Sequence, residues 1–129
     1  MNTQKRKEIE EDLVLTKDFV FNGDLEVHGN ITGKAGKLFD ITVKGDIKAT
    51  GNISAGNVSA WDITVWGDIS AHGDISAHGD IMVWGDISAR DISYYAVCVA
   101  YNNIKYRTIK GWRTNAKHFV LDGTIVEGD

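Results

Sequence analysis

The chain has 129 residues, of which 43% are hydrophobic, and its formal net charge is −4. This length and composition indicate one soluble domain, and the acidic balance argues against an electrostatic nucleic-acid binder. No apolar run approaches the roughly 20 residues of a transmembrane helix, and the polar amino terminus lacks the apolar core of a secretory signal. We therefore expect a cytoplasmic protein without a transmembrane segment.

The first 12 residues form a charged segment that precedes any regular pattern. Residues 5–11 read Lys-Arg-Lys-Glu-Ile-Glu-Glu, which predicts either a short helix or a frayed end. The pattern begins at Leu13. We therefore divide the chain into a charged segment over 1–12 and a β-helix domain over 13–129, with irregular coils over 97–129.

From Leu13 onward, an apolar residue follows Asp or Asn about every six residues, most clearly over 67–90. A second apolar or small residue stands two positions later, so both point to one interior while the residue between them faces water. Each unit predicts a short strand and a corner. The expected first inward residues are Leu13, Phe19, Leu25, Ile31, Ile41, Ile47, Ile53, Val58, Ile63, Ile69, Ile75, Ile81, Ile87, Ile92 and Val97.

Such short strands cannot bury their apolar side alone and must stack on equivalent strands of neighbouring coils. Three units make one coil of about 17 residues, and the chain holds roughly seven coils. The predicted fold is all-β: a single-stranded, three-sided parallel β-helix. Left-handed hexapeptide coils usually place the small inward residue before the aliphatic one, and parallel crossovers prefer the right hand. The order Ile-x-Ala therefore favours a right-handed helix.

The Asp and Asn residues at the corners are expected to bond their own backbone, next to glycines that permit positive φ angles. The alternative is a calcium ladder along one edge. The glycine-rich nonapeptide that binds calcium in some β-rolls is absent, so we expect neither a metal site nor a cofactor.

The histidines and the cysteine are weak candidates for chemistry. His72 and His78 are outward on consecutive faces, with His28 in the same place of its own face, and we interpret all three as solvated surface residues. His118 has less context still. Cys98 has no defined histidine partner and is not expected to be a nucleophile. We expect Tyr94, Tyr95, Tyr101 and Tyr106 to pack the irregular end.

Three tryptophans form the candidate interaction surface. Trp66 and Trp84 are 18 residues apart in matching faces and should stack on the outside, and Trp61 is outward in another face. Exposed indoles in a row are typical of a contact with a protein partner or, less often, with a sugar ring. A terminal segment that folds back over them is the alternative.

The chain contains units of about six residues with the pattern Gly-x-Ile/Val-x-Ala/Gly-x, in a core of this length. In these features it resembles the bactofilins, a bacterial family of polymer-forming β-helical cytoskeletal proteins. The resemblance covers roughly Leu13 to Ile92, with a weaker echo over 119–128. It implies a right-handed triangular β-helix, end-to-end polymerisation without nucleotide, and a scaffolding role.

The expected function is therefore that of a structural protein, not an enzyme, which assembles with itself through the open ends of its coil. The first alternative is an interaction or adhesion module of a phage or surface assembly that uses the tryptophans. The second is a hexapeptide-type acyltransferase, which the reversed Ile-x-Ala order and the lack of an acid/base pair disfavour.

Overall fold

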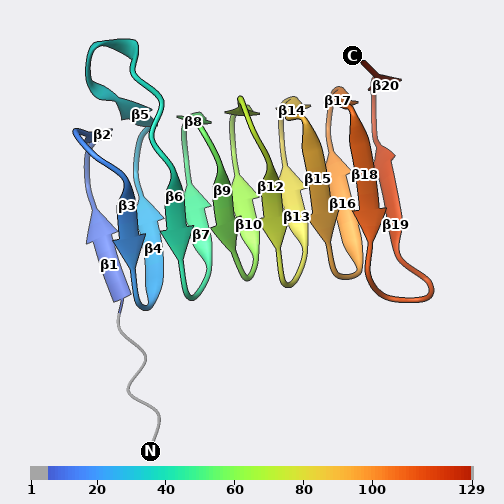
Figure 1. Ribbon diagram of the computed structural model, residues 1–129, viewed down its shortest axis with the longest axis horizontal. Helices are drawn as coiled ribbons and strands as arrows, with labels where there is room; N and C mark the ends of the chain where they lie inside the picture. Colours follow the sequence, from blue (N-terminus) through green and yellow to red (C-terminus); the bar gives the residue numbers. More distant parts are fainter. Residues whose placement is uncertain (1–5, 129) are drawn as a thin grey trace, which may run out of the picture.

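The computed structural model describes residues 6–128, which form a three-sided β-solenoid of about seven coils stacked along one axis (Figure 1). Three parallel sheets, which we call A, B and C, run the length of the stack with seven, seven and six strands. None of the described residues forms a helix long and apolar enough to cross a membrane. The predicted three-sided parallel β-helix is confirmed, whereas its right-handedness stays a prediction.

The three sheets take every third strand of the chain in turn. Sheet A contains β1 (Arg6–Ile9), β4 (Asp24–Val27), β7 (Ile47–Ala49), β10 (Ile63–Val65), β13 (Ile81–Val83), β16 (Val97–Ala100) and β19 (Lys117–Val120). Sheet B contains β2 (Leu13–Leu15), β5 (Ile31–Gly33), β8 (Ile53–Ala55), β11 (Ile69–Ala71), β14 (Ile87–Ser88), β17 (Ile104–Tyr106) and β20 (Ile125–Glu127). Sheet C contains β3 (Phe19–Phe21), β6 (Ile41–Val43), β9 (Val58–Ala60), β12 (Ile75–Ala77), β15 (Asp91–Tyr94) and β18 (Thr108–Gly111).

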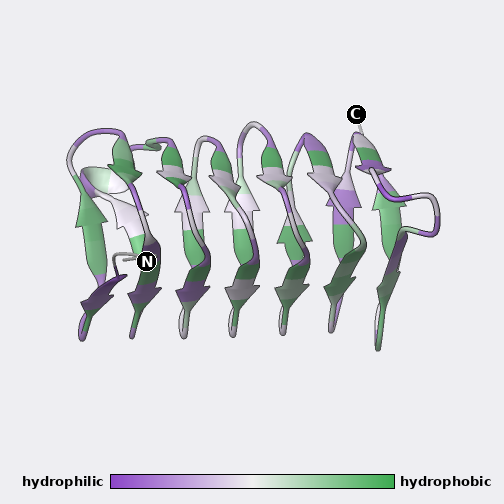
Figure 2. Ribbon diagram, turned by 90° about the horizontal axis from the view of Figure 1, so that it is seen from below, coloured by the Kyte–Doolittle hydropathy of each residue, from purple (hydrophilic) through white to green (hydrophobic). Residues whose placement is uncertain are grey.

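The interior consists of stacked aliphatic columns, as the two-residue alternation predicts. In a typical strand, Ile75 and Ala77 are buried and Ser76 between them is partly exposed. Hydrophobic residues recur at the same place in successive coils (Figure 2), and no polar or charged residue is buried within the described chain. Each fully buried isoleucine contributes about 1.5–3 kcal/mol, so the columns supply most of the stabilisation.

Strand register sets the coil length. Ile47 pairs with Ile63, and Ile63 pairs with Ile81, so these two successive coils contain 16 and 18 residues, close to the predicted 17. Identical β-branched side chains thereby stack directly on one another, which fills the interior without gaps.

One predicted inward position is wrong. Ile81 pairs with Cys98 instead of Val97, so Cys98 and Ala100 are buried whereas Val97 and Val99 point outward. Every residue of this strand is apolar or small, so the alternation of apolar and polar residues does not show which of them point inward. Val97 is the outward first residue of β16, so the inward positions Ile92 and Cys98 are six residues apart.

The corner aspartates and asparagines form three hydrogen-bonded ladders along the axis, which we call the corner ladders. The Oδ1 atom of Asn30 accepts a bond from the backbone N–H of Asn52 at 2.7 Å, and Asn52 in turn accepts from Asp68 at 2.8 Å. The expectation that these side chains bond their own backbone is wrong. The acceptors are Asp24, Asp46, Asp62 and Asp80 before sheet A, Asp12, Asn30, Asn52, Asp68, Asp86 and Asn103 before sheet B, and Asp18, Asp40 and Asn57 before sheet C.

The corner ladders explain the glycine that precedes most of their members. A Cβ atom on Gly85 would collide with Oδ1 of Asp68 and would lie 2.8 Å from the carbonyl oxygen of Gly67. A positive φ is rarely the reason, because Gly23 is the only described glycine before a ladder residue that has one. Glycine is therefore needed for space between coils.

The ladder bonds differ slightly in length from corner to corner. At corners of three residues, the bonds donated by Asn52 and Asp68, which follow glycines, are 2.7 and 2.8 Å long. The bond donated by Asn103, which follows an asparagine at a similar corner, is 3.0 Å long. At corners of two residues this difference is absent, because the bonds donated by Asn57, after a glycine, and by Asp62, after a tryptophan, are both 3.0 Å long.

Asp46 offers a test of charge within a ladder. Neighbouring coils displace water from its carboxylate, and together with the charges of Asp62 and Asp24 they raise its pKa, although the bond from the Asp62 N–H opposes this. A raised pKa in the folded state gives stability that is complete below the ordinary value of 3.8 and is lost as the pH rises through the raised value. Ionised Asp46 is thus unfavourable at neutral pH.

We therefore expect Asp46→Asn to raise the thermal unfolding midpoint at pH 7 by about 2 °C. Asparagine keeps the Oδ1 acceptor and removes the charge, as Asn30 and Asn52 do in the neighbouring ladder. The gain should vanish below about pH 3.8, and Asp46→Ala, which removes the acceptor, should lower the midpoint at both pH values. A gain that persists in acid would contradict a charge effect.

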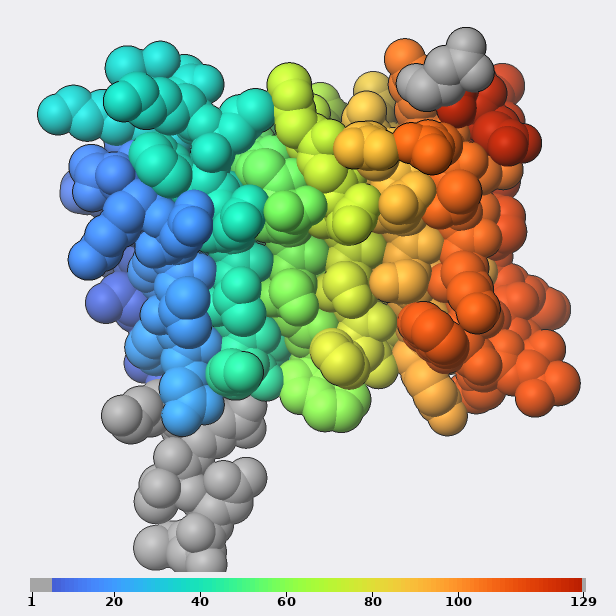
Figure 3. Space-filling view, in the orientation of Figure 1, coloured from blue at the N-terminus to red at the C-terminus, as the bar shows by residue number. Residues whose placement is uncertain are grey.

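Two regions depart from the regular coil. The expected helix or frayed end is wrong for residues 6–9, which form β1 and pair with β4, while residues 1–5 lie outside the described chain. The solenoid therefore begins before the predicted boundary at residue 13. The irregular stretch over 34–40 contains a short 3₁₀ turn, Lys34–Gly36, and protrudes at one end of the stack, as the 112–116 loop does at the other (Figure 3).

Candidate interaction surfaces

The outward face of sheet A changes from charged to apolar along the solenoid. Its first two strands present Glu8 and Glu26, whereas its last three present Met82, Val99 and Phe119. Met82 and Phe119 are 44% and 41% exposed. Neighbouring apolar side chains that remain in water are the usual sign of a contact surface.

Aromatic side chains follow the last residue of three successive sheet A strands. We call Trp66, Trp84 and Tyr101 the aromatic edge. The rings of Trp66 and Trp84 stack with centroids 4.9 Å apart and planes 3° apart, which confirms the predicted stacking. Both indoles are 43% exposed, so no described segment folds back to cover them. Their use as an interaction surface stays a prediction.

The geometry of this stack bears on the sugar-binding alternative. A sugar ring packs against the face of an indole, but Trp66 and Trp84 turn one face toward each other at a separation close to one coil spacing. The ammonium of Lys48 lies 5.7 Å from the centre of the Trp66 ring. Trp84 and Lys48 thus lie against the ring of Trp66, which at this residue favours a protein partner over a carbohydrate.

An apolar hollow of about 300 Å³ lies beside the aromatic edge. Its wall is formed by side chains of β13, β16 and β19 and of the corners that follow them. The residues are Met82, Trp84, Val99, Tyr101, Phe119 and Leu121, together with the backbone of Val83. The volume is at the lower limit of small-molecule sites, and the nearly continuous apolar lining suits a hydrophobic side chain.

Trp61 does not join the aromatic edge. It precedes β10, whereas Trp66 follows that strand, so the two lie at opposite corners of sheet A. Its ring instead contacts His78 with centroids 5.2 Å apart. His72 follows β11 in sheet B and His78 follows β12 in sheet C, so the structure does not bring these two histidines together.

His28 lies at the surface, as predicted, but it is also part of an ionic cluster that was not predicted from the sequence. Its Nε2 atom lies 2.9 Å from a carboxylate oxygen of Glu8 and 2.9 Å from one of Glu26, and Arg6 pairs with Glu26 at 2.6 Å. The hydrogen bond with Glu8 raises the pKa of His28, and the same bond lowers the pKa of Glu8. The signal in the sequence was the spacing of one coil between these residues.

The cluster also has the donor atoms of a metal site. Glu8, Glu26 and His28 each offer one ligand atom, and these atoms lie within 4.8 Å of one another. The ion pairs already compensate the two carboxylates. The arrangement is therefore explained by the charges of the chain itself.

The other residues considered for chemistry lie at the carboxyl-terminal end of the core. Cys98 is fully buried, and burial raises its pKa to about 12, so the thiol stays protonated at neutral pH and cannot act as a thiolate nucleophile. Tyr94 is buried as expected, with its hydroxyl 3.0 Å from Nδ1 of His118. Tyr95 and Tyr101 are exposed, so the expectation that they pack this end is wrong.

Comparison with protein-family models, with curated proteins and with solved structures found no match for this chain. Three features of the solenoid itself bear on its function. These are its open ends, the apolar half of sheet A, and the polar corners between the sheets.

Proposed function

We propose that this protein is a structural, non-catalytic protein that assembles end to end through its terminal coils. The observation that carries the proposal is the open edge at both ends of the described solenoid. β1 and β19 each have a neighbour on one side only, as have β2 and β20. Unpaired strand edges are templates for pairing with another chain. The resemblance to bactofilins supports the same function.

A head-to-tail contact would continue the existing pattern. β1 of one molecule would lie on β19 of the next and β2 on β20, in the same parallel orientation that these sheets have internally. Apolar side chains at the open end would then be buried, since Ile125 is 38% exposed although its counterpart Ile104 in the preceding coil is fully buried. Strand pairing and burial would stabilise the contact together.

Two basic residues at the ends would control the strength of this contact. Lys7 pairs in register with buried Leu25, and His118 pairs with buried Cys98, so both occupy the inward column of sheet A. In a head-to-tail contact Lys7 would face His118. Charged residues that point inward at an edge are a known protection against uncontrolled pairing, so we expect assembly that depends on concentration and salt.

The test is electron microscopy and analytical ultracentrifugation of the purified protein over a range of concentrations, without nucleotide. We expect filaments one solenoid wide. The double variant Lys7→Leu/His118→Leu should lower the concentration needed for assembly about tenfold or more, because it replaces two basic groups by apolar ones in the buried column. Ile125→Lys should abolish assembly.

Lys117→Leu is the matched control, because Lys117 precedes His118 in β19 but faces outward with Val97. It should leave assembly unchanged. Particles of single-chain mass for the native protein and for the Lys7→Leu/His118→Leu variant alike would refute end-to-end assembly.

A second candidate function is an interaction module that uses the aromatic edge and the adjacent apolar hollow. The observation that favours it is the concentration of exposed Met82, Trp84 and Phe119 on one sheet. Trp84→Ala separates the two functions. If the protein assembles end to end, this variant should still form filaments. If the protein is an interaction module, the native solenoid stays monomeric and captures a protein partner, and this variant should lose that capture.

A further inference from the structure

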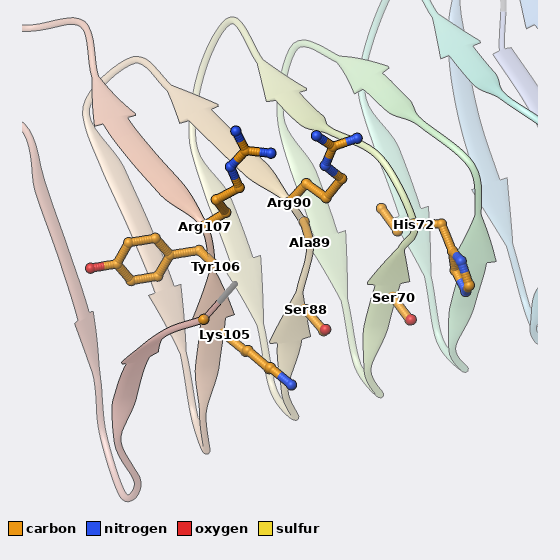
Figure 4. Close-up of a pocket in the computed structure, with 10 residues that line it drawn as sticks. Ser70, His72, Ser88, Ala89, Arg90, Lys105, Tyr106 and Arg107 are labelled. Carbon is orange, nitrogen blue, oxygen red and sulfur yellow. The ribbon is translucent and has the colours of Figure 1, made fainter.

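A second hollow, of about 630 Å³, lies where the strands of sheet B end and the chain turns toward sheet C (Figure 4). Its floor is made of small side chains from β11 and β14 and the residue after them, among them Ser70, Ser88 and Ala89. This volume is within the range of small-molecule sites. Because the floor residues are small, the larger side chains of the next coil form its wall.

Three cationic side chains, Arg90, Lys105 and Arg107, belong to this wall, with His72 on the far side. The chain as a whole is acidic, with 18 carboxylate residues against 14 lysines and arginines. Nevertheless, none of the three cations lies within ion-pair distance of an acidic side chain of the described residues. Each ion pair among the described residues involves Arg6 or His28. Within residues 6–128, the positive charge gathered at the hollow is therefore not paired with any carboxylate.

The fold holds the two arginines side by side. The backbone N–H of Arg107 donates to the carbonyl oxygen of Arg90 at 2.6 Å, so the residues occupy the same corner of consecutive coils, about 4.8 Å apart. Asp91, the nearest carboxylate in sequence, accepts a bond from the Thr108 hydroxyl at 2.6 Å. Figure 4 shows both guanidinium groups on one side of the hollow and the Lys105 ammonium on the other.

The polar side chains of this hollow are mainly hydrogen-bond donors. Guanidinium and ammonium groups only donate hydrogen bonds, and the serine hydroxyls of the floor can also donate. A guanidinium fork matches two oxygens of one phosphate, and two adjacent forks match neighbouring phosphate groups. Positive charge concentrated in a concave surface also attracts anions from solution.

We propose that this hollow, which we call the basic groove, binds a compact anion with two or more phosphate groups. Arg90 and Arg107 bind adjacent phosphates, Lys105 neutralises the remaining charge, and Ser70 and Ser88 donate to phosphate oxygens at the floor. The cationic and serine side chains of this site belong to coils before the last one, although Gly128, which follows β20, also borders the hollow. None of these side chains belongs to the aromatic edge or to an open strand edge, so failure of anion binding would leave the proposed function untouched.

The test is equilibrium dialysis of the whole protein against radiolabelled inorganic tripolyphosphate at low and physiological salt. We expect saturable binding at one site per chain. The variant Arg90→Gln/Arg107→Gln should bind at least about tenfold more weakly, because it loses the bidentate charged contacts. Arg90→Lys/Arg107→Lys, which keeps the charge but not the forks, should fall between the two.

Lys17→Gln/Lys44→Gln is the matched control, since it removes the same charge from exposed corners elsewhere. It should bind as the native protein does, and circular dichroism should show all variants folded. Equal weakening in the control, or no saturable binding by the native protein, would overturn the proposal. Flotation with phosphatidylcholine vesicles, with and without phosphatidylinositol bisphosphate, decides whether a lipid headgroup or a free anion is the ligand.

Discussion

Replacing Ile75 by aspartate is expected to abolish cooperative folding. Ile75 is completely buried and stacks between Val58 and Ile92 of the adjacent coils. The change removes about 1.5–3 kcal/mol of apolar burial and places a carboxylate in the core, where no described side chain can compensate its charge. The sum exceeds about 4 kcal/mol, a large part of the total stability of a domain.

Ser76→Asp is the matched control, because Ser76 is the next residue of the same strand and faces outward. Its effect on the free energy of unfolding should stay within about 0.5 kcal/mol. Urea titrations followed by circular dichroism measure both variants. Equal destabilisation by the two aspartates would show that the assignment of inside and outside is wrong.

Gly85→Ala should cost about 2 kcal/mol, a large effect for the addition of one methyl group. The new Cβ would strike Oδ1 of Asp68 and lie 2.8 Å from the Gly67 carbonyl oxygen, which belongs to the backbone of the preceding coil and has little room to move. The ladder bond from the Asp86 N–H to Asp68, now 2.8 Å, should lengthen as well.

Gly56→Ala provides the comparison within the same fold. A Cβ there would lie 2.6 Å from Oδ1 of Asp40, a side-chain atom, and its other neighbours are 3.8 Å away. The equivalent corner two coils later carries Arg90 in this place, because the Gly73 N–H donates to the Gly56 carbonyl oxygen and the Arg90 N–H donates to that of Gly73. We expect a loss below about 1 kcal/mol. If thermal unfolding shows the same loss at both glycines, steric conflict between coils is not the cause.

Hydrophobic periodicity was sufficient to predict most strands, because each inward pair such as Ile75 and Ala77 is marked by a polar residue on either side. It was not sufficient at Val97–Ala100, where all four residues are apolar or small, nor at Arg6–Ile9, where charged residues form a terminal strand. A terminal strand has no neighbour above it and therefore needs less apolar character.

The candidate sites were predictable only in part, for a related reason. The stack of Trp66 on Trp84 follows from a spacing of one coil in a regular stretch. The contact of His28 with Glu8 spans 20 residues in a coil of irregular length, and the basic groove joins residues from four coils. Such sites become visible only when the exact register of every coil is known.

The corner ladders also make the length of this molecule easy to change in evolution. Each ladder bond joins only adjacent coils, as do the strand pairs, so no contact of this kind reaches a third coil. Duplication of one unit of 16 to 18 residues would extend the axis by about 4.8 Å and leave every other ladder bond in place. At the smaller scale of one face, residues 67–72 and 73–78 are identical and read Gly-Asp-Ile-Ser-Ala-His twice, so the same six residues fit two different sheets.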